Sequence, residues 1–271
     1  MTYVTVDDGT QLYWEESGSG EPLLLIQGLG WSADMWHALV PLLEQSYRVI
    51  RYDGRGIGRS EVPGGPYSIE RMADDAVGVL ASAGVDKAHV LGVSLGGIVA
   101  QEVALRHPDV VISLILGCTH PGGAETVWPE PEVLENLKAR ATMPFDEAVK
   151  ASITYAYAPG TPATIIQADL DRRIALPTSS EGYTAQLTGG LGYQGTLPRL
   201  KGLAVPALVF TGDADLLVPP VNSTTLIAAI PDGRLVVIPG AGHVVFSERP
   251  AEVAAAILEF LADAKSRHAA R

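Results

Sequence analysis

The stretch that most constrains how this chain folds runs from Leu91 to Gly97 and reads Leu-Gly-Val-Ser-Leu-Gly-Gly. It joins a short β-like run, Ala88 to Leu91, to a helix-like run, Leu95 to Arg106. Gly92 to Gly96 therefore fits the pattern Gly-x-Ser-x-Gly at a turn from a strand into a helix. A turn this tight holds its central residue in a strained backbone conformation, and glycines two positions away on either side let the strand and the helix approach closely. The pattern predicts that the Ser94 hydroxyl projects clear of a sheet.

Apolar runs typical of buried strands alternate with helix-like segments on both sides of this turn. An antiparallel pair around Asp8-Gly9 precedes them. Strands are then predicted at 22–27, 47–52, 88–91, 110–116, 203–212 and 234–238, and helices at 32–42, 68–84, 95–106, 223–230 and 251–261. Such alternation predicts the α/β class, with a mostly parallel, twisted sheet, helices on both faces and right-handed crossovers.

The alternation fails between residues 120 and 200. This stretch is rich in Pro, Gly, Thr and Ala, has helix-like pieces at 132–143 and 146–155, and contains no convincing buried strand. We interpret it as a mostly helical cap, inserted after the sixth strand and lying over the ends of the strands. Residues 1–119 and 201–271 would then form the core domain, with 262–271 as a frayed tail.

The composition limits the partners of the chain. Its 271 residues are enough to bury a substantial core, and its net charge is −12 without any local cluster of Lys or Arg. Nucleic acid and anionic membranes are therefore not expected as partners. A single cysteine excludes an intrachain disulfide framework, the N-terminus lacks the pattern of a signal peptide, and no apolar run has the length of a membrane span. We expect a cytoplasmic protein, and the sequence leaves association into a homo-oligomer open.

A second glycine-rich loop, Asp53 to Ser60, follows the strand predicted at 47–52. Its spacing matches neither a P-loop nor a dinucleotide-binding fingerprint, and Pro63-Gly64-Gly65-Pro66 stands where a helix would have to begin. We interpret it as a structural turn pinned by Asp53 or Arg55.

Side chains suited to nucleophilic catalysis follow three of the predicted strands. In an open parallel sheet, the loops at the carboxyl ends of the strands form the ligand crevice. Besides the Ser94 turn, these loops include Gly212 to Pro219, with Asp213 and Asp215, and Pro239 to His243. A serine hydroxyl needs a nearby base to accept its proton, and the histidine needs a carboxylate to fix its tautomer. The chain offers the three side chains in the order Ser, Asp, His.

These motifs resemble those of the α/β-hydrolase superfamily, in which a serine turn, an acid and a histidine follow one another in that order. The resemblance is strongest to small capped esterases, lactonases and cofactor-free haloperoxidases, with the enol-lactonases as the nearest comparison. It implies an α/β-hydrolase fold, no cofactor and a small-molecule ester or lactone as substrate. The segments that carry it are 27–30, 53–60, 92–97, 212–219 and 240–250.

The resemblance also implies roles for individual residues. Ser94 would be the nucleophile and His243 the general base. Asp215, at the family position Gly-x-x-Asp, would orient the histidine, and Asp213 would cap its turn. The oxyanion hole would consist of the backbone N–H groups of Leu95, which follows the nucleophile, and of Leu29. Many relatives have His before Gly28, where this chain has Gln27, and this departure leaves the hydrogen bonding of that loop open.

Three further side chains are candidates for substrate binding: Trp31, His120 and Trp128. Each has a plain structural alternative, since aromatic residues near a cap often serve packing and His120 could be a hinge residue. Cys118 reads as a small buried hydrophobe. No metal site is expected, because the remaining histidines have no ligand spacing. These are His37, His89, His107 and His268.

Two other functions are compatible with the same motifs. Perhydrolysis, the haloperoxidase activity, and carbon–carbon bond hydrolysis use the same triad. Dehalogenases and epoxide hydrolases of this superfamily use an aspartate nucleophile where this chain has Ser94, which disfavours them. A protein that binds a ligand in the pocket without turning it over is a third hypothesis, since a fold does not prove a function.

Overall fold

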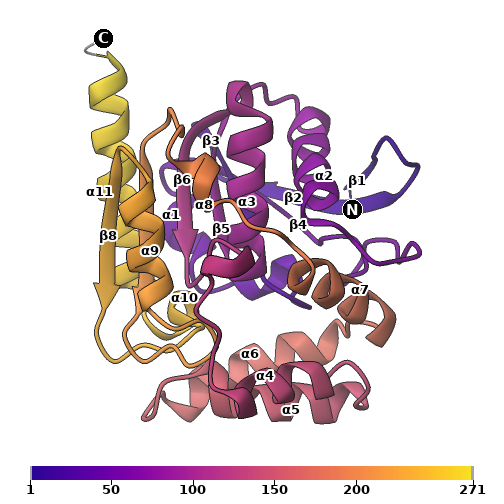
Figure 1. Ribbon diagram of the computed structural model, residues 1–271. Helices are drawn as coiled ribbons and strands as arrows, with labels where there is room; N and C mark the ends of the chain where they lie inside the picture. Colours follow the sequence, from indigo (N-terminus) through magenta and orange to yellow (C-terminus); the bar gives the residue numbers. More distant parts are fainter. Residues whose placement is uncertain (1, 270–271) are drawn as a thin grey trace.

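The computed structural model describes residues 2–269 and contains one eight-stranded sheet (Figure 1). The strand order is β1-β2-β4-β3-β5-β6-β7-β8, so the first and the last strand in the sequence are the two edge strands of the sheet. β2 runs antiparallel to its neighbours β1 and β4, and every other pair is parallel. The strands are β1 (Thr2–Thr5), β2 (Gln11–Ser17), β3 (Glu21–Ile26), β4 (Tyr47–Tyr52), β5 (Ala88–Val93), β6 (Val111–Gly117), β7 (Ala207–Gly212) and β8 (Gly233–Ile238). The predicted α/β class is confirmed.

Helices cover both faces of the sheet, because successive residues of a strand point to opposite faces and both must be buried. In β5, for example, Val90 packs into one hydrophobic cluster and Leu91 into the other. The first cluster includes residues of α2 (Ile69–Ser82), α3 (Leu95–Arg106) and α9 (Val221–Ala229). The second includes residues of α1 (Val40–Leu43), α10 (Val245–Glu248) and α11 (Pro250–Ala269).

Two of the predicted helices differ from the structure. Residues 32–42 do not form one helix: they form a 3₁₀ turn, η1 (Ala33–Trp36), followed by the short α1. Pro41 has no N–H with which to continue a helix from η1, and the Ser32 side chain makes no cap hydrogen bond to η1. The tail predicted to be frayed from residue 262 is instead helical as far as Ala269, while residues 270 and 271 lie outside the described part.

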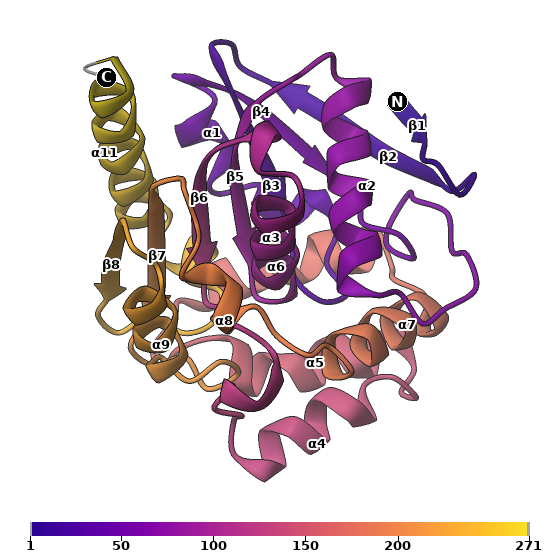
Figure 2. The ribbon, with the colours of Figure 1, turned by 45° about the horizontal axis from the view of Figure 1, so that its top comes forward.

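The segment 120–200 is helical, and its described residues contain no strand. Figures 1 and 2 show α4, α5 and α6 as a layer across the end of the sheet toward which the strand arrows point, with α7 beside them. We call residues 120–200 the cap; its division from the core as a separate domain remains a prediction. Its elements are η3 (Gly123–Glu125), α4 (Pro131–Ala139), α5 (Phe145–Ala156), α6 (Ala163–Ala175), α7 (Ser180–Leu191) and α8 (Leu197–Leu200).

Two of the cap helices, α6 and α7, were not predicted. Pro162 precedes the first, and the Ser179 hydroxyl accepts the Gly182 N–H at 3.0 Å to cap the second. Across the described part of the chain, no helix combines the length and the apolar character needed to cross a membrane.

Candidate active site

The turn between β5 and α3 has the predicted strained geometry. Ser94 has φ 54° and ψ −125°, and its N–H donates to Gly117 O at 2.9 Å. A Cβ on Gly92 would lie 2.1 Å from Gly96 O, and a Cβ on Gly96 would lie 2.3 Å from Ile26 O. Neither position has room for a side chain, so the close approach of β5, α3 and β3 depends on these two glycines.

The loop after β3 lies directly against this turn. A Cβ on Gly28 would be 3.0 Å from Ser94 Cβ, and Leu29 and Leu95 line the same cavity as Ser94. Gln27 Oε1 accepts the Gly28 N–H at 2.9 Å, so the glutamine that stands in place of the usual histidine contributes a hydrogen bond to this loop. In the described residues, the N–H groups of Leu29 and Leu95 donate to no protein acceptor, so both are available to a ligand.

Asp215 and His243 form a buried hydrogen-bonded pair. Asp215 Oδ2 lies 2.9 Å from His243 Nδ1, and Asp215 Oδ1 accepts the N–H groups of Leu217 and Val218, each at 2.9 Å. The carboxylate is therefore held at three points, and its contact with Nδ1 favours the tautomer in which Nε2 is free to act as a base. Asp213 is exposed and accepts the Gly240 N–H at 2.6 Å, so its side chain holds the neighbouring loop after β8 and does not cap its own turn as predicted.

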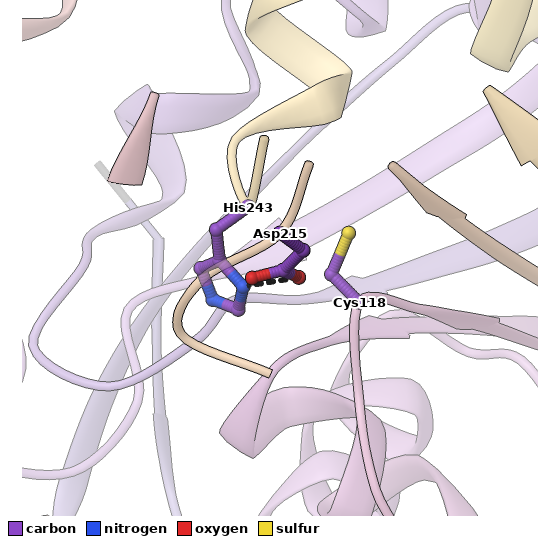
Figure 3. A group of neighbouring side chains, drawn as sticks. All are labelled: Cys118, Asp215 and His243. Atoms are coloured by element: carbon purple, nitrogen blue, oxygen red, sulfur yellow. Dashed lines mark hydrogen bonds and ion pairs between the residues drawn. The ribbon is translucent and has the colours of Figure 1, made fainter. Parts of the chain in front are cut away.

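Cys118 lies on the other side of Asp215 from His243, as Figure 3 shows. The three side chains offer ligand-type atoms within 4.8 Å of one another. Burial, and then the charge of Asp215, raise the pKa of the Cys118 thiol well above its ordinary value, so the sulfur stays protonated. A neutral thiol is a weak metal ligand, and the Asp215 oxygens already accept hydrogen bonds from the protein. This donor set suits a hydrogen-bonded acid–imidazole pair better than a metal.

Ser94 and His243 meet at one cavity between the core and the cap. The cavity is open to solvent at its mouth, and side chains of both the core and the cap line it. Its walls are mainly apolar and include Leu134, Leu137 and Leu187 of the cap. Ser94 Oγ makes no hydrogen bond to His243 in the described residues, and such contacts are often long before substrate binds.

All three candidate binding residues, Trp31, His120 and Trp128, line this cavity. The His120 ring packs against Trp128 at 5.5 Å between centroids, and its Nδ1 accepts the Gly122 N–H at 3.1 Å. Burial, and then the nearby His243, lower the pKa of His120 to about 4, so the ring is neutral near pH 7. His120 is thus a wall residue and also holds the start of the cap.

Three polar residues of the cavity wall were not predicted from the sequence: Thr126, Arg140 at the end of α4, and Ser152 in α5. Arg140 falls in a helix-like run, where nothing in the spacing distinguishes an arginine facing a cavity from one facing water. Only the packing of α4 against α7 decides which way its side chain lies, since its guanidinium stacks on Tyr183 at 5.3 Å.

The loop Asp53 to Ser60 is a structural turn, as predicted. Asp53 accepts the Arg59 Nε–H at 2.7 Å, and Arg55 binds Asp75 through two hydrogen bonds of 2.5 and 2.7 Å. The other histidines have separate contacts: His37 with Asp169, His89 with Ser113, and His107 with Asp74. The side chain of His268 lies outside the described residues.

Comparison with known proteins agrees with this geometry. The family model of the alpha/beta hydrolase fold matches residues 21–250, and the chain belongs to this family. It is 35% identical over 273 residues to a pimeloyl-acyl-carrier-protein methyl ester esterase of Edwardsiella ictaluri, covering 94% of this chain and 98% of the relative.

Solved structures of similar length show the same fold. A thermophilic esterase from Thermogutta terrifontis, solved with malate bound, has a TM-score of 0.86 and 30% identity, covering 97% of this chain and 98% of the other. The enol-lactonase from Burkholderia xenovorans LB400 has a TM-score of 0.85 and 28% identity, covering 96% and 100%. This chain is therefore an α/β hydrolase with relatives named as esterases and lactonases.

Proposed function

We propose that this protein is a serine hydrolase that cleaves a carboxylic ester or lactone through an acyl-enzyme. Ser94 is the nucleophile, His243 the general base and Asp215 the orienting carboxylate. The observation that carries the proposal is the buried Asp215–His243 pair, 2.9 Å apart, at the cavity into which the strained Ser94 turn faces. A strained serine and an oriented imidazole at one cavity form the arrangement that nucleophilic acyl transfer requires.

In the acylation step, Ser94 Oγ attacks the carbonyl carbon while His243 Nε2 takes its proton. The charge that develops on the carbonyl oxygen is stabilised by the N–H groups of Leu29 and Leu95, which donate to no acceptor within residues 2–269. When the tetrahedral intermediate collapses, the bond to the leaving oxygen breaks and His243 returns the proton to that oxygen. An open ester releases an alcohol, whereas the new hydroxyl group of an opened lactone stays attached to the acyl group.

In the deacylation step, water takes the place of the serine hydroxyl. His243 removes a proton from the water, the hydroxide attacks the acyl carbon, and the proton returns to Ser94 Oγ as the acid leaves. Asp215 stabilises the imidazolium in both steps without accepting its proton. The reaction therefore balances with water as the sole co-reactant.

The names of the relatives support the ester and lactone class. Those described above are an acyl-carrier-protein methyl ester esterase, a thermophilic esterase and an enol-lactonase. The mainly apolar cavity wall also fits an acyl group. The cytoplasmic location, the small-molecule substrate and any homo-oligomer remain predictions.

The test is labelling of Ser94 together with turnover of an activated ester. The wild-type protein should react with a fluorophosphonate probe and hydrolyse p-nitrophenyl acetate, and Ser94→Ala should abolish both. Ser32→Ala is the matched control, because Ser32 is buried but does not line the cavity. A folded wild-type protein that neither labels nor cleaves any activated ester would contradict the proposal. Peroxide-dependent bromination, measured on the same preparation, distinguishes a perhydrolase.

A further inference from the structure

Two buried arginines of the cap, Arg140 and Arg173, form no ion pair with any residue that the structure describes. Among the arginines whose side chains the structure describes, Arg140, Arg172 and Arg173 make no ion pair. Arg172 is partly exposed, so water can solvate it, but Arg140 is 7% exposed and Arg173 is 8% exposed. Buried guanidinium groups are normally paired, because removing an unpaired charge from water is costly.

The partners that these arginines do have are neutral. Arg173 donates from Nη1 to Ser152 Oγ at 2.7 Å and lies 5.1 Å above the Trp31 ring, while its buried Nε has no acceptor in the described residues. Arg140 stacks on Tyr183 and lines the cavity directly. Ser152 Oγ already donates to Val149 O at 2.6 Å. Aromatic faces and one hydroxyl therefore leave most of the guanidinium donors unused.

The nearest acidic candidate in sequence is already engaged elsewhere. Asp169, one turn before Arg173 on α6, accepts hydrogen bonds from His37 at 2.6 Å and from the Tyr157 hydroxyl at 2.9 Å. Burial, and then the positive charge of Arg140, lower the pKa of Arg173 to about 10 although the charge of Asp169 acts to raise it, so Arg173 remains cationic at neutral pH. The cap thus places one arginine on the cavity wall, Arg140, and a second one behind it, in a chain whose net charge is −12.

We infer that Arg140, backed by Arg173, forms an anion subsite at the cap end of the active-site cavity, and that the substrate carries a carboxylate in addition to the ester or lactone group. This inference rests on the proposed function, because Arg140 lines the same cavity as Ser94 and His243. A substrate carboxylate would accept hydrogen bonds from the guanidinium donors that have no protein acceptor. A guanidinium binds a carboxylate through paired hydrogen bonds. The largely apolar walls fit a single charge on a carbon chain better than a phosphate, whose greater charge would need more donors.

The test compares two series of esters that differ in one charge. Monomethyl esters of the dicarboxylic acids from succinic to pimelic carry a terminal carboxylate, and the methyl alkanoates from butanoate to heptanoate have matched lengths without it. Because a hydrogen bond to a charged group contributes more than a neutral one, we expect kcat/KM to favour at least one monoanion by roughly ten- to a hundredfold over its neutral match. The difference should lie mainly in KM, since the carboxylate is bound in the ground state and the transition state alike.

The variants separate charge from folding. Arg140→Met should remove the preference for the monoanion, and Arg140→Lys should restore part of it, since lysine keeps the charge but not the fork of donors. Arg173→Met should weaken the preference less, because Arg173 lies behind the cavity wall. Arg172→Met, one residue away on α6, is the control and should keep the preference. Thermal unfolding of each variant shows whether it has folded.

The outcomes distinguish the inference from the proposed function. If the wild-type protein hydrolyses neutral esters but prefers no monoanion, or if the preference survives in folded Arg140→Met, the subsite is refuted while the hydrolase stands. If no ester is cleaved at all, the proposed function fails, and calorimetric binding of adipate and glutarate to the wild-type protein decides the subsite alone. Binding that is lost in Arg140→Met but not in Arg172→Met supports it, and no binding refutes it.

Discussion

The core and the cap face each other across one cavity, and they differ in whether their buried charged side chains are paired. On the core side, Asp215 is paired with His243, and Arg55 with Asp75. On the cap side, Arg140 and Arg173 are buried and form no ion pair with a carboxylate of the described residues. A paired charge has a fixed position, which catalysis needs, whereas an unpaired one is stabilised by a ligand that brings the opposite charge. Under the proposals above, the core residues determine the type of reaction and the cap residues determine which substrate binds.

The two regions are nevertheless tied together beside His243. Glu248 of α10 accepts the Ala158 N–H of the cap at 2.8 Å through Oε1, and the Gly242 N–H at 2.7 Å through Oε2. Gln186 of α7 accepts the Gly30 N–H at 3.1 Å, next to the proposed oxyanion donor Leu29. One core carboxylate and one cap amide thus fix the cap against the loops that carry His243 and Leu29.

The largest effect expected on the core side comes from the carboxylate behind His243. Asp215→Asn should lower kcat for p-nitrophenyl acetate by about 10⁴-fold, because an amide favours the wrong tautomer of the imidazole. Asp213→Asn is the control, since this exposed residue holds only the Gly240 N–H. Steady-state kinetics of both variants check the assignment, and an equal loss in the two would argue against the distinct roles given to Asp213 and Asp215.

A second prediction tests whether backbone contacts fix the serine turn. Gly96→Ala would put a Cβ 2.3 Å from Ile26 O and 2.4 Å from Gln27 O, so it should lower the free energy of unfolding by about 3 kcal/mol or more. Gly64→Ala is the matched control, because nothing lies within 4 Å of its Cβ, and it should change stability by less than about 0.5 kcal/mol. Urea unfolding measures both, and a Gly96→Ala protein as stable as wild type would show that the turn relaxes.

The smallest effect expected concerns His120, where the cap begins. Its pKa lies near 4 when folded and at 6.5 ordinarily, so the unfolded chain takes up a proton first as the pH falls. The stability of the wild-type protein should therefore decrease between about pH 6.5 and 4 through this ring, with no contribution from it above that window. The loss should be below about 3 kcal/mol, because the ring is only partly buried.

His120→Gln should remove that part of the acid sensitivity. Urea unfolding of wild type and variant at pH 7 and pH 4.5 gives the comparison, and the other histidines contribute equally to both proteins. If the two proteins lost the same stability on acidification, the ring would be protonated in the folded state, and the burial of His120 against the cap would be weaker than the structure indicates.

Most of the backbone of the core could be predicted from the sequence, apart from the segment 32–42 and the C-terminal helix beyond residue 261. The strand at 47–52 and the helix at 95–106 match β4 and α3 residue for residue, because a run buried on both faces and a helix closed by His107-Pro108 are local patterns. The cap was less predictable. Its helices α6 and α7 have polar faces and short apolar stretches, and they are stable only through packing on the core, which a local pattern does not record.

The residues of the site also divide into those that the sequence identifies and those that only the tertiary structure places. Ser94, Asp215 and His243 are identifiable from short motifs that follow strands, because in a parallel sheet the ends of the strands converge. Their order in the chain and the glycines around Ser94 determined the class of reaction proposed. Only the tertiary structure decided that Arg140 is buried on the cavity wall and that Arg173 is buried behind it. The sequence does not show whether an arginine in a helix faces water or a cavity. The packing of one helix against another determines the direction of its side chain.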